Sequence, residues 1–284
     1  MNASDLVSVV ITTYNRSDAL LAVLDSLARQ TDSNFEVIVA DDGSSEEHRE
    51  CILASGVALS LKLCHVWHPD TGFTASLIRN LGVAETISAY FVFLDGDCVP
   101  ELDFIARHKA LVQTGCFVNG SRVLLSPDLT RRVLSGTESI CRRDRLFWLK
   151  QRLQGHASKL SHLLRLPNAF VRVRRKFSLR GIRSCNMGVW KADFERVNGF
   201  DESFIGWGHE DADFVLRLHH SGVKRKNGFC ATEVFHLWHK EASRARESQN
   251  AHIVRARAKT GETQPVLGYS VQRENGGVVV TRLG

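Results

Sequence analysis

Several features that define whole classes of protein are missing from this 284-residue chain. Its seven cysteines are odd in number and form no Cys-x-x-Cys pair, and nothing ahead of Val7 resembles a secretion signal. No apolar run approaches the roughly 20 residues that a membrane-spanning helix needs, and the longest, residues 89–94, suits a buried strand. We therefore expect a cytoplasmic protein in a reducing environment that does not span a membrane.

The composition excludes disordered, collagenous and coiled-coil proteins. Hydrophobic residues make up 43% of the chain and charged residues 24%, close to the averages for globular proteins. A chain of this length fits one large α/β domain, or two small ones that share a core.

The net charge of +6 is unevenly distributed. Between Arg131 and Arg183 stand fifteen Lys or Arg residues against two acids, Glu138 and Asp144, and leucines and aromatic residues are interleaved with the cations. Such a stretch is either the solvated face of a helical insertion or an anion-binding surface. The chain has no zinc-ligand spacing, aromatic RNA-binding motif or clear helix-turn-helix, so we expect no nucleic acid partner. A membrane surface or a phosphorylated lipid fits the stretch better.

Hydrophobic periodicity predicts an alternation of strands and helices in the first hundred residues. The expected strands are 6–13, 35–40, 59–63 and 89–94, and the expected helices include 20–27 and 74–86. This order predicts a parallel sheet wound with helices, of the nucleotide-binding kind, in which ligands bind at the carboxyl ends of the strands. The second half is less regular, with a helix expected at 212–220, a strand at 229–235, and a polar helix and tail after Arg244.

Two pairs of carboxylates follow predicted strands. Asp95 and Asp97 flank Gly96, and in an extended backbone positions i and i+2 face the same way. Two hard oxygen ligands on one face suit Mg²⁺ or Mn²⁺ bridging a diphosphate, although a solvated turn is the alternative. Asp42, which follows Asp41, is placed to accept hydrogen bonds from a base or ribose, or simply to form the turn before a glycine.

The richest cluster of functional side chains runs from Gly206 to Asp213. Two glycines flank Trp207, and Glu210, Asp211 and Asp213 follow at the start of a predicted helix. Helix capping explains one of these carboxylates. A stacking platform with a general base explains Trp207 and all three acids.

Two histidines stand near the end of the last predicted strand. If the strand continues through both, the odd offset places His236 and His239 on opposite faces, so that at most one joins a shared metal site. A lone histidine is usually structural. Beside two candidate metal-binding aspartates, His236 becomes a candidate imidazole ligand, which favours Mn²⁺.

Taken together, these motifs resemble those of family-two inverting glycosyltransferases with the GT-A fold. The resemblance covers about residues 7–240 and rests on the following segments: Val7 to Arg16, Asp41-Asp42-Gly43-Ser44, Arg79-Asn80-x-Gly82, Asp95-Gly96-Asp97, Asn186-Met187-Gly188, Gly199-Phe200-Asp201-Glu202 and Gly206 to Asp213. The last three are similar to the C-terminal motif of galactosyltransferase-type enzymes and bacterial polysaccharide polymerases. The implied fold is an α/β, Rossmann-like, mainly parallel sheet flanked by helices, with a basic helical insertion.

The resemblance implies a role for each matching residue. Thr12, Tyr14, Asp42 and Arg79 match positions that hold the uridine and ribose, and Asp95 matches a contact to the nucleotide sugar. Asp97 and His236 match the metal ligands, for Mn²⁺ or Mg²⁺. Asp211 matches the catalytic base, with Glu210 and Trp207 forming the wall around the acceptor and the donor sugar.

The implied activity is a metal-dependent, single-displacement transfer of a hexose or N-acetylhexosamine from a UDP-sugar to a cell-surface glycan acceptor: lipopolysaccharide, capsule or lipid-linked oligosaccharide. A protein or peptide acceptor is one alternative, and a non-catalytic sugar-nucleotide-binding partner protein is another. The sequence departs from the motif at His209, where glycine is usual, and at Ala212, where an acid is usual.

The expected organisation has three parts. Residues 1–100 form a nucleotide-sugar-binding half, and residues 101–245 form an acceptor-binding half that includes the basic insertion 131–183. Residues 246–284 form a C-terminal tail. We expect the enzyme to be peripheral at the inner face of the membrane, where 131–183 meets anionic lipid.

Overall fold

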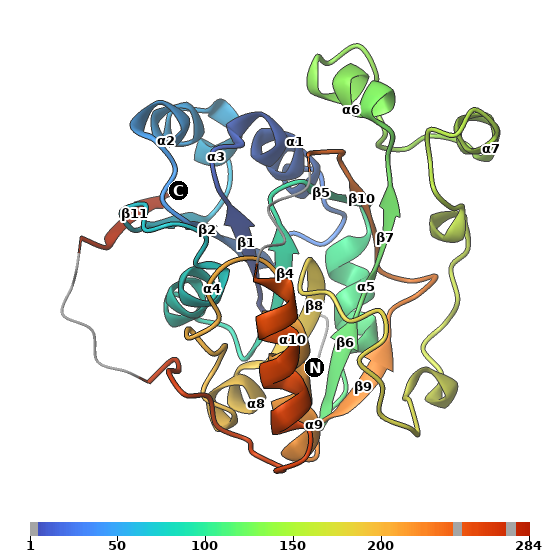
Figure 1. Ribbon diagram of the computed structural model, residues 1–284. Helices are drawn as coiled ribbons and strands as arrows, with labels where there is room; N and C mark the ends of the chain where they lie inside the picture. Colours follow the sequence, from blue (N-terminus) through green and yellow to red (C-terminus); the bar gives the residue numbers. More distant parts are fainter. Residues whose placement is uncertain (1–4, 241–245, 271–276) are drawn as a thin grey trace.

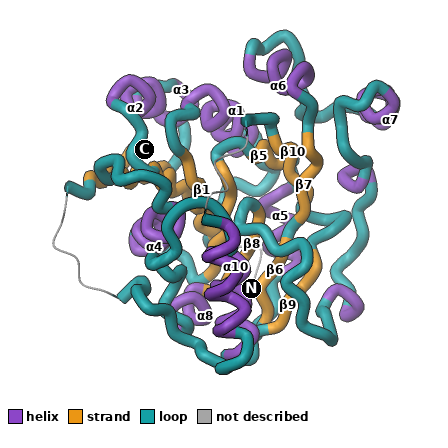
Figure 2. Tube along the Cα trace, viewed as in Figure 1, coloured by secondary structure: helices purple, strands orange, loops and turns teal. Residues whose placement is uncertain are grey.

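The computed structural model describes residues 5–240, 246–270 and 277–284. Its centre is an eight-stranded sheet of order β11-β3-β2-β1-β4-β8-β6-β9, and a second sheet has the order β5-β10-β7. Helices cover both faces of the large sheet (Figures 1 and 2). The strands are β1 Val7–Thr13, β2 Phe35–Asp41, β3 Leu63–Trp67, β4 Tyr90–Asp95, β5 Cys98–Pro100, β6 Cys116–Asn119, β7 Ser121–Leu124, β8 Asn186–Trp190, β9 Lys224–Asn227, β10 Glu233–His236 and β11 Val279–Leu283.

Helices connect many of these strands along the chain. They are α1 Ser17–Ala28, α2 Glu46–Leu53, α3 Gly56–Leu59, α4 Ala75–Ala84, α5 Phe104–Leu111, α6 Pro127–Leu134, α7 Arg145–Leu153, α8 Lys191–Arg196, α9 Glu210–His220 and α10 Glu247–Arg257, with 3-10 turns η1 Ser161–Leu163 and η2 Phe170–Arg172. The predicted fold class is correct, because the chain forms a mixed α/β domain around a large central sheet.

The four parallel strands β3, β2, β1 and β4 come from the first hundred residues. The sheet is mixed beyond them, because β8 runs antiparallel to β4 and β11 runs antiparallel to β3. The C-terminal residues thus join the edge of the N-terminal half of the sheet. The two halves expected from the sequence share one sheet.

Side chains from the two faces of β1 enter different parts of the core. Val9 packs with α1 residues such as Leu20 on one face, while Val10 packs on the other with an aromatic group that includes Phe93 and Phe200. Successive side chains of a strand point to opposite faces, so a strand buried on both sides has a continuous apolar sequence.

Two strand predictions in the sequence are wrong in position. Residues 59–63 were expected to form the third strand, but residues 56–59 form α3, where the Ser55 hydroxyl caps Ala58 N at 3.3 Å, and β3 starts only at Leu63. The strand expected at 229–235 begins only at Glu233. Residues 228–232 turn, with Thr232 N donating to the Gly228 carbonyl at 2.9 Å, and β9 and β10 lie on either side.

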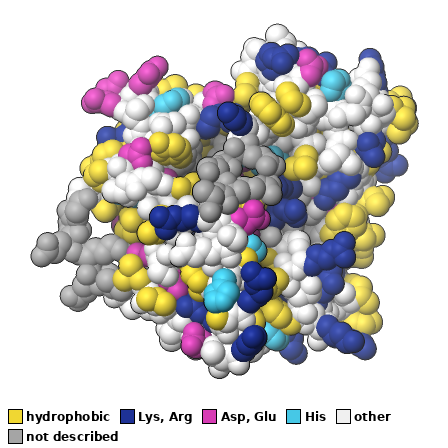
Figure 3. Space-filling view, viewed as in Figure 1, with side chains coloured by type: hydrophobic (Ala, Val, Ile, Leu, Met, Phe, Trp, Pro, Cys, Tyr) yellow, Lys and Arg dark blue, Asp and Glu magenta, His cyan; other side chains and the backbone are white. Residues whose placement is uncertain are grey.

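The basic segment 131–183 is only partly helical. It contains the end of α6, all of α7 and the turns η1 and η2, joined by irregular chain that descends one side of the molecule in Figure 1. On that side the space-filling view shows Lys and Arg side chains intermixed with hydrophobic ones (Figure 3). None of the helices within the described ranges is both long and apolar enough to cross a bilayer.

Candidate active site

The carboxyl ends of neighbouring parallel strands bring the first motifs together. Thr12 of β1 is paired with Asp95 of β4, and Gly96 N donates to the Thr12 carbonyl at 2.8 Å. A Cβ at Gly96 would lie 3.1 Å from that carbonyl oxygen and 3.2 Å from the Cβ of Thr13. Glycine between the two aspartates therefore lets the loop after β4 lie directly on β1.

The second sheet places histidines beside Asp97. His236 of β10 is paired with Cys98 of β5, and Leu237 N donates to the Asp97 carbonyl at 2.8 Å. The Nε2 atoms of His236 and His239 lie 3.7 and 3.3 Å from the two carboxylate oxygens of Asp97. The expectation that the two rings point to opposite faces is wrong, because β10 ends at His236 and the chain no longer alternates beyond it.

This arrangement fits a divalent cation. Ligand atoms of Asp97, Cys98 and His236 lie within 4.8 Å of one another. Burial and then the nearby cation of Arg122 lower the pKa of His236 to about 3, so the imidazole is neutral and can act as a ligand. Burial and the neighbouring Asp95 raise the pKa of Asp97 to about 6. A bound cation would relieve this repulsion between neighbouring carboxylates.

One buried arginine joins the loop after β4 to the start of α9. The guanidinium of Arg79 lies 3.5 Å from Asp95 Oδ1 and 3.1 Å from Glu210 Oε1, and its side chain is only 6% exposed. Asp95 and Glu210 stand more than a hundred residues apart in the sequence. These two ion pairs, which we call the Arg79 bridge, therefore bring two motifs that are distant in the sequence into one acidic site.

Asp211 lies beside this bridge with the properties of a general base. Burial, and then the charge of Glu210, raise the pKa of Asp211 to about 7, although Arg79 opposes the shift. Ala212 N donates to Asp211 Oδ1 at 2.7 Å, which fixes the carboxylate. A base is most effective when its pKa is close to the working pH.

Asp213 does not belong to the candidate site. Its fully buried carboxylate pairs with Arg217 at 2.8 Å and with Arg257, and Arg257 also pairs with Asp201 at 3.0 Å. The sequence interpretation that included Asp213 in the catalytic cluster is therefore wrong. Its position four residues before Arg217 on α9 makes it half of a structural ion pair.

The residues assigned to the uridine and ribose lie along the ends of β1 and β2. Thr12 Oγ1 is buried with no hydrogen-bond partner in the described ranges, so it can bond a ligand. Asp42 is occupied within the protein, because its carboxylate accepts hydrogen bonds from Thr74 N at 2.9 Å and from His68 Nε2 at 3.1 Å. The hydroxyl of exposed Tyr14 donates to Asp70 at 2.9 Å.

Trp207 lies on the loop that leads into α9. It is 36% exposed, and its neighbours Gly206 and Gly208 have φ values of +77° and +103°. Left-handed backbone of this kind favours glycine, so the two glycines allow the turn that presents the indole.

Other motif residues hold the framework. The amide of Asn80 accepts from Phe200 N at 2.9 Å and donates to Glu202 Oε1 at 2.6 Å. A Cβ at Gly199 would lie 2.6 Å from the Asn80 oxygen. These contacts place the loop before α9 against α4.

Residues 8–180 match glycosyl transferase family 2, and residues 165–240 match the model described as the N-terminal domain of galactosyltransferase. The first match covers more than half of the chain. The chain belongs to glycosyl transferase family 2. The predicted family resemblance is thus confirmed.

Several curated proteins are similar to this family member. The validoxylamine A glucosyltransferase of Streptomyces hygroscopicus subsp. jinggangensis is 31% identical over 234 residues, which cover 77% of this chain and 52% of that protein. The chondroitin synthase of Escherichia coli is 28% identical over 234 residues, covering 77% of this chain and 33% of that protein. The chain thus spans about half the length of the first relative and a third of the second.

Solved structures share the fold at low sequence identity. S. aureus TarS 1–349 in complex with UDP superposes with a TM-score of 0.58 at 14% identity, covering 90% of this chain and 64% of that one. The mannosyltransferase PcManGT from Pyrobaculum calidifontis in complex with GDP-Man and Mn²⁺ gives 0.51 at 17% identity, with 90% and 62% covered. These likenesses confirm the GT-A fold class.

Sequence patterns missed several members of this family site. Burial raises the pKa of Asp95, and the nearby charges of Arg79 and Arg122 oppose this shift. Cys98 and Cys185 lie with Asp95 in a second compact group. His239 was considered but placed on the wrong face. The pairing of β10 with β5 and β7 brings His236, Cys98 and Arg122 to one place, and the pairing of β8 with β4 adds Cys185.

The departure at His209 has a structural cost. His209, at the position where the family motif usually has glycine, has a left-handed backbone with a φ of +71°. Glycine adopts this conformation freely, whereas a side chain with a Cβ is strained.

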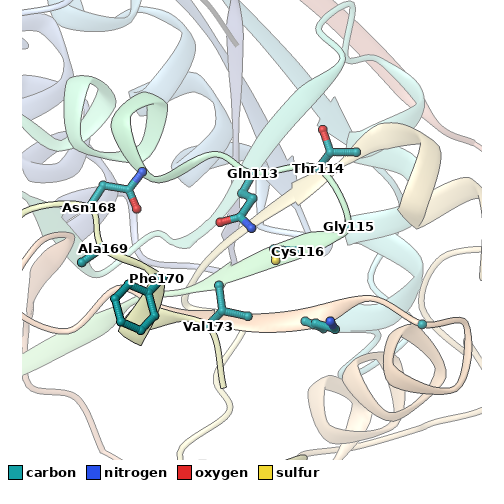
Figure 4. Close-up of a pocket in the computed structure, with 10 residues that line it drawn as sticks. Gln113, Thr114, Gly115, Cys116, Asn168, Ala169, Phe170 and Val173 are labelled. Carbon is teal, nitrogen blue, oxygen red and sulfur yellow. The ribbon is translucent and has the colours of Figure 1, made fainter. Parts of the chain in front are cut away.

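A separate hollow of about 640 Å³ lies away from these acids (Figure 4). None of the candidate site residues lines it. Its walls come from the start of β6, η2 and the start of β9, and include Gln113, Cys116, Asn168, Phe170 and Lys224. Since β6 runs in the same direction as β4, this hollow is at the opposite edge of the sheet from Asp95.

Proposed function

We propose that this family member is an inverting glycosyltransferase that moves a hexose or N-acetylhexosamine from a UDP-sugar to a cell-surface glycan acceptor. The observation that carries the proposal is the Arg79 bridge, which holds Asp95 and Glu210 in one site with Asp211 beside it. A donor motif and a candidate base are then within reach of the same sugar. The UDP and UDP-GlcNAc complexes of TarS support the choice of nucleotide.

On the acceptor side, Asp211 removes the proton of the attacking hydroxyl. Its raised pKa, about 7, lets the carboxylate hold a proton as the new glycosidic bond forms. Glu210 Oε2 is buried without a hydrogen-bond partner in the described ranges, and we assign it to a hydroxyl of a bound sugar. Trp207 offers an apolar face to a sugar ring.

On the donor side, Asp97 and His236 would hold Mn²⁺ or Mg²⁺, with His239 and Cys98 beside them. When bound, such a cation offsets the negative charge that develops on a diphosphate leaving group. Asp95 and Arg79 orient the sugar end of the donor, and Thr12 Oγ1 bonds the nucleoside. Arg122 adds a positive charge near the same carboxylates. Attack from the face opposite the departing UDP inverts the anomeric centre.

We place the acceptor at the inner face of the cytoplasmic membrane, as lipopolysaccharide, capsule or a lipid-linked oligosaccharide. The chondroitin synthase relatives support a polysaccharide product. The basic segment 131–183 supports a phosphate-rich acceptor surface.

Donor hydrolysis tests the class without knowledge of the acceptor. UDP release is measured from a panel of UDP-sugars, with GDP-mannose as a nucleotide control, in Mn²⁺, in Mg²⁺ and with chelator. We expect cation-dependent release from one UDP-sugar that Asp97→Ala abolishes. Asp128→Ala, at an exposed aspartate on α6, is the matched control and should keep wild-type release.

Transfer to extracted glycolipid and to a peptide library then separates the acceptor classes. Transfer to peptides alone would replace the proposed acceptor. UDP binding without release from any donor, with either acceptor present, would instead support a non-catalytic partner protein.

A further inference from the structure

The helix α7 (Arg145–Leu153) exposes an apolar stripe. Leu146, Leu149 and Leu153 are 74%, 45% and 80% exposed, while Trp148 and Gln151 are buried. At about 100° per residue, the three leucines fall within about 60° of one another on the side opposite Gln151. A surface helix of a globular protein normally turns its leucines to the core. The three exposed leucines of α7 depart from this pattern and leave an apolar surface in contact with solvent.

Cations border this stripe on both sides. On the same helical projection Lys150 lies beyond Leu146, and Arg145 and Arg152 lie beyond Leu149. No carboxylate within the described ranges makes a salt bridge with Arg145, Lys150 or Arg152. Leucines flanked by unpaired cations are the pattern of helices that lie in a membrane interface.

The chain after α7 continues the same surface. Leu164, Leu166, Phe170 and Val171 are 50 to 82% exposed. Arg174, Arg175 and Lys176 are exposed directly after them. This segment and α7 run down one side of the molecule in Figure 1, where Figure 3 shows yellow and dark blue side chains intermixed.

The buried side of α7 packs against the second sheet. The ring of Trp148 stacks on Phe235 of β10 with 4.5 Å between centroids and 7° between planes. His236, a candidate metal ligand, is the next residue. The exposed stripe is thus presented from a fixed position relative to the active site.

We propose that this docking surface, α7 with residues 164–176, binds an anionic membrane. The leucines enter the boundary between headgroups and acyl chains, and the cations lie at the lipid phosphates. Charge complementarity selects this occupant, because fifteen cations against two acids in 131–183 would repel a second copy of the same surface. The proposal deepens the proposed function and rests on it only for the lipid-linked nature of the acceptor.

The test is co-sedimentation of the full chain with phosphatidylcholine vesicles, either pure or with about 40% phosphatidylglycerol, at low and high salt. We expect binding to the anionic vesicles only, weakened by salt. The apolar variant Leu146→Ser, Leu149→Ser, Leu153→Ser and the charge variant Arg145→Gln, Lys150→Gln, Arg152→Gln should each bind about tenfold more weakly or worse.

Matched control variants carry the same changes elsewhere. Leu59→Ser, Ile87→Ser, Val266→Ser replaces three other exposed apolar residues, and Lys62→Gln, Arg255→Gln, Lys259→Gln replaces three other exposed cations. Both controls should bind vesicles as wild type does. All of these positions are on the surface, and circular dichroism melting verifies that each variant is folded.

Three results would overturn the proposal: equal binding to neutral and anionic vesicles, no binding to either, or wild-type binding by both α7 variants. A dimer in gel filtration that the leucine variant dissociates, without vesicle binding, would make the stripe an interface between copies. The proposed function and the membrane-docking surface can be tested separately, because the α7 variants should retain donor hydrolysis in solution. A wild type that binds vesicles but cleaves no donor would contradict the proposed function and leave the docking surface standing.

Discussion

At the scale of single residues, Asp211, the base that we propose, shows how burial changes the acidity of an ordinary carboxyl group. Low polarity around the group and the charge of Glu210 disfavour the ionised form, and the pKa rises to about 7. An aspartate with its usual pKa would be fully ionised at neutral pH but would be a weak proton acceptor.

The transfer reaction should therefore depend on pH through Asp211. Because the ionised carboxylate is the active form, kcat/KM should fall as pH drops below about 7 and level off above it. Asp211→Asn should lower kcat/KM by about 10² to 10⁴ and remove this slope. Steady-state kinetics from pH 5.5 to 9 would check both. An unchanged profile in the variant would assign the base to another group.

His209 allows a second test at this scale. Its φ of +71° strains a residue with a Cβ, so His209→Gly should raise the free energy of unfolding by about 1 kcal/mol. The control is Ala258→Gly, at a φ of −59°, which should lower it by about 0.5 to 1 kcal/mol. Urea unfolding of both variants measures the difference. A loss of stability in His209→Gly would mean that the imidazole makes a stabilising contact that outweighs the strain.

The sequence identified most candidate side chains because they directly follow apolar strands. Asp95 ends β4 and Asp97 follows it, and parallel strands carry such residues to a common edge. The partners of those side chains could not be predicted. Nothing in the sequence pairs Arg79 with Glu210, and Asp213 has the same local pattern as Asp211 although it is structural.

At the scale of elements, the continuous apolar strands β1, β2 and β4 of the parallel half were predicted, whereas the polar strand β9 and short strands such as β6 were not. The central strand β4 is a continuous apolar run, as expected for a strand buried on both faces. The edge strand β9 has the sequence Lys-Arg-Lys-Asn and was missed, since only its backbone pairing with β6 makes it a strand. Secondary structure at a sheet edge depends more on its partner than on local propensity.

The pairing of β4 with β8 explains a glycine in the Asn186-Met187-Gly188 motif. A Cβ at Gly188 would lie 1.9 Å from the hydroxyl oxygen of Tyr90, which is paired with Trp190, two residues further along β8. Gly188→Ala should lower the free energy of unfolding by about 2 kcal/mol or more. Gly56→Ala, where no atom lies within 4 Å of the added Cβ, should change it by less than about 0.5 kcal/mol. Equal stabilities by urea unfolding would mean that Tyr90 moves aside at little cost.

At the scale of the whole molecule, buried ion pairs join the C-terminal helix α10 to α9 and to the loop before it. Arg257 of α10 contacts Asp213 of α9 and Asp201 of the preceding loop, and all three side chains are at most 5% exposed. The sequence predicted a polar helix in this region, but it indicated no contact that would hold this helix against the rest of the protein. The apolar side of α10 is small, so these ion pairs decide where the helix lies.

Breaking this network should destabilise the fold strongly. Arg257→Met leaves Asp201 without its guanidinium partner and should lower the free energy of unfolding by about 3 kcal/mol. Arg255→Met, at an exposed arginine on the same helix, should change it by less than about 0.5 kcal/mol. Thermal and urea unfolding of both variants measure this difference in stability. A small effect of Arg257→Met would show that solvent reaches the two carboxylates.

The adjacent residues Arg79 and Asn80 have a consequence for engineering. One contacts the acids of the site, and the other clamps the loop at Phe200 that leads into α9. A single turn of α4 therefore affects both the charge balance of the candidate site and the position of the loop before α9. A chimera that exchanges residues 199–213 between family members to change acceptor choice must carry compatible residues at 79 and 80, because loop and helix turn behave as one transferable module.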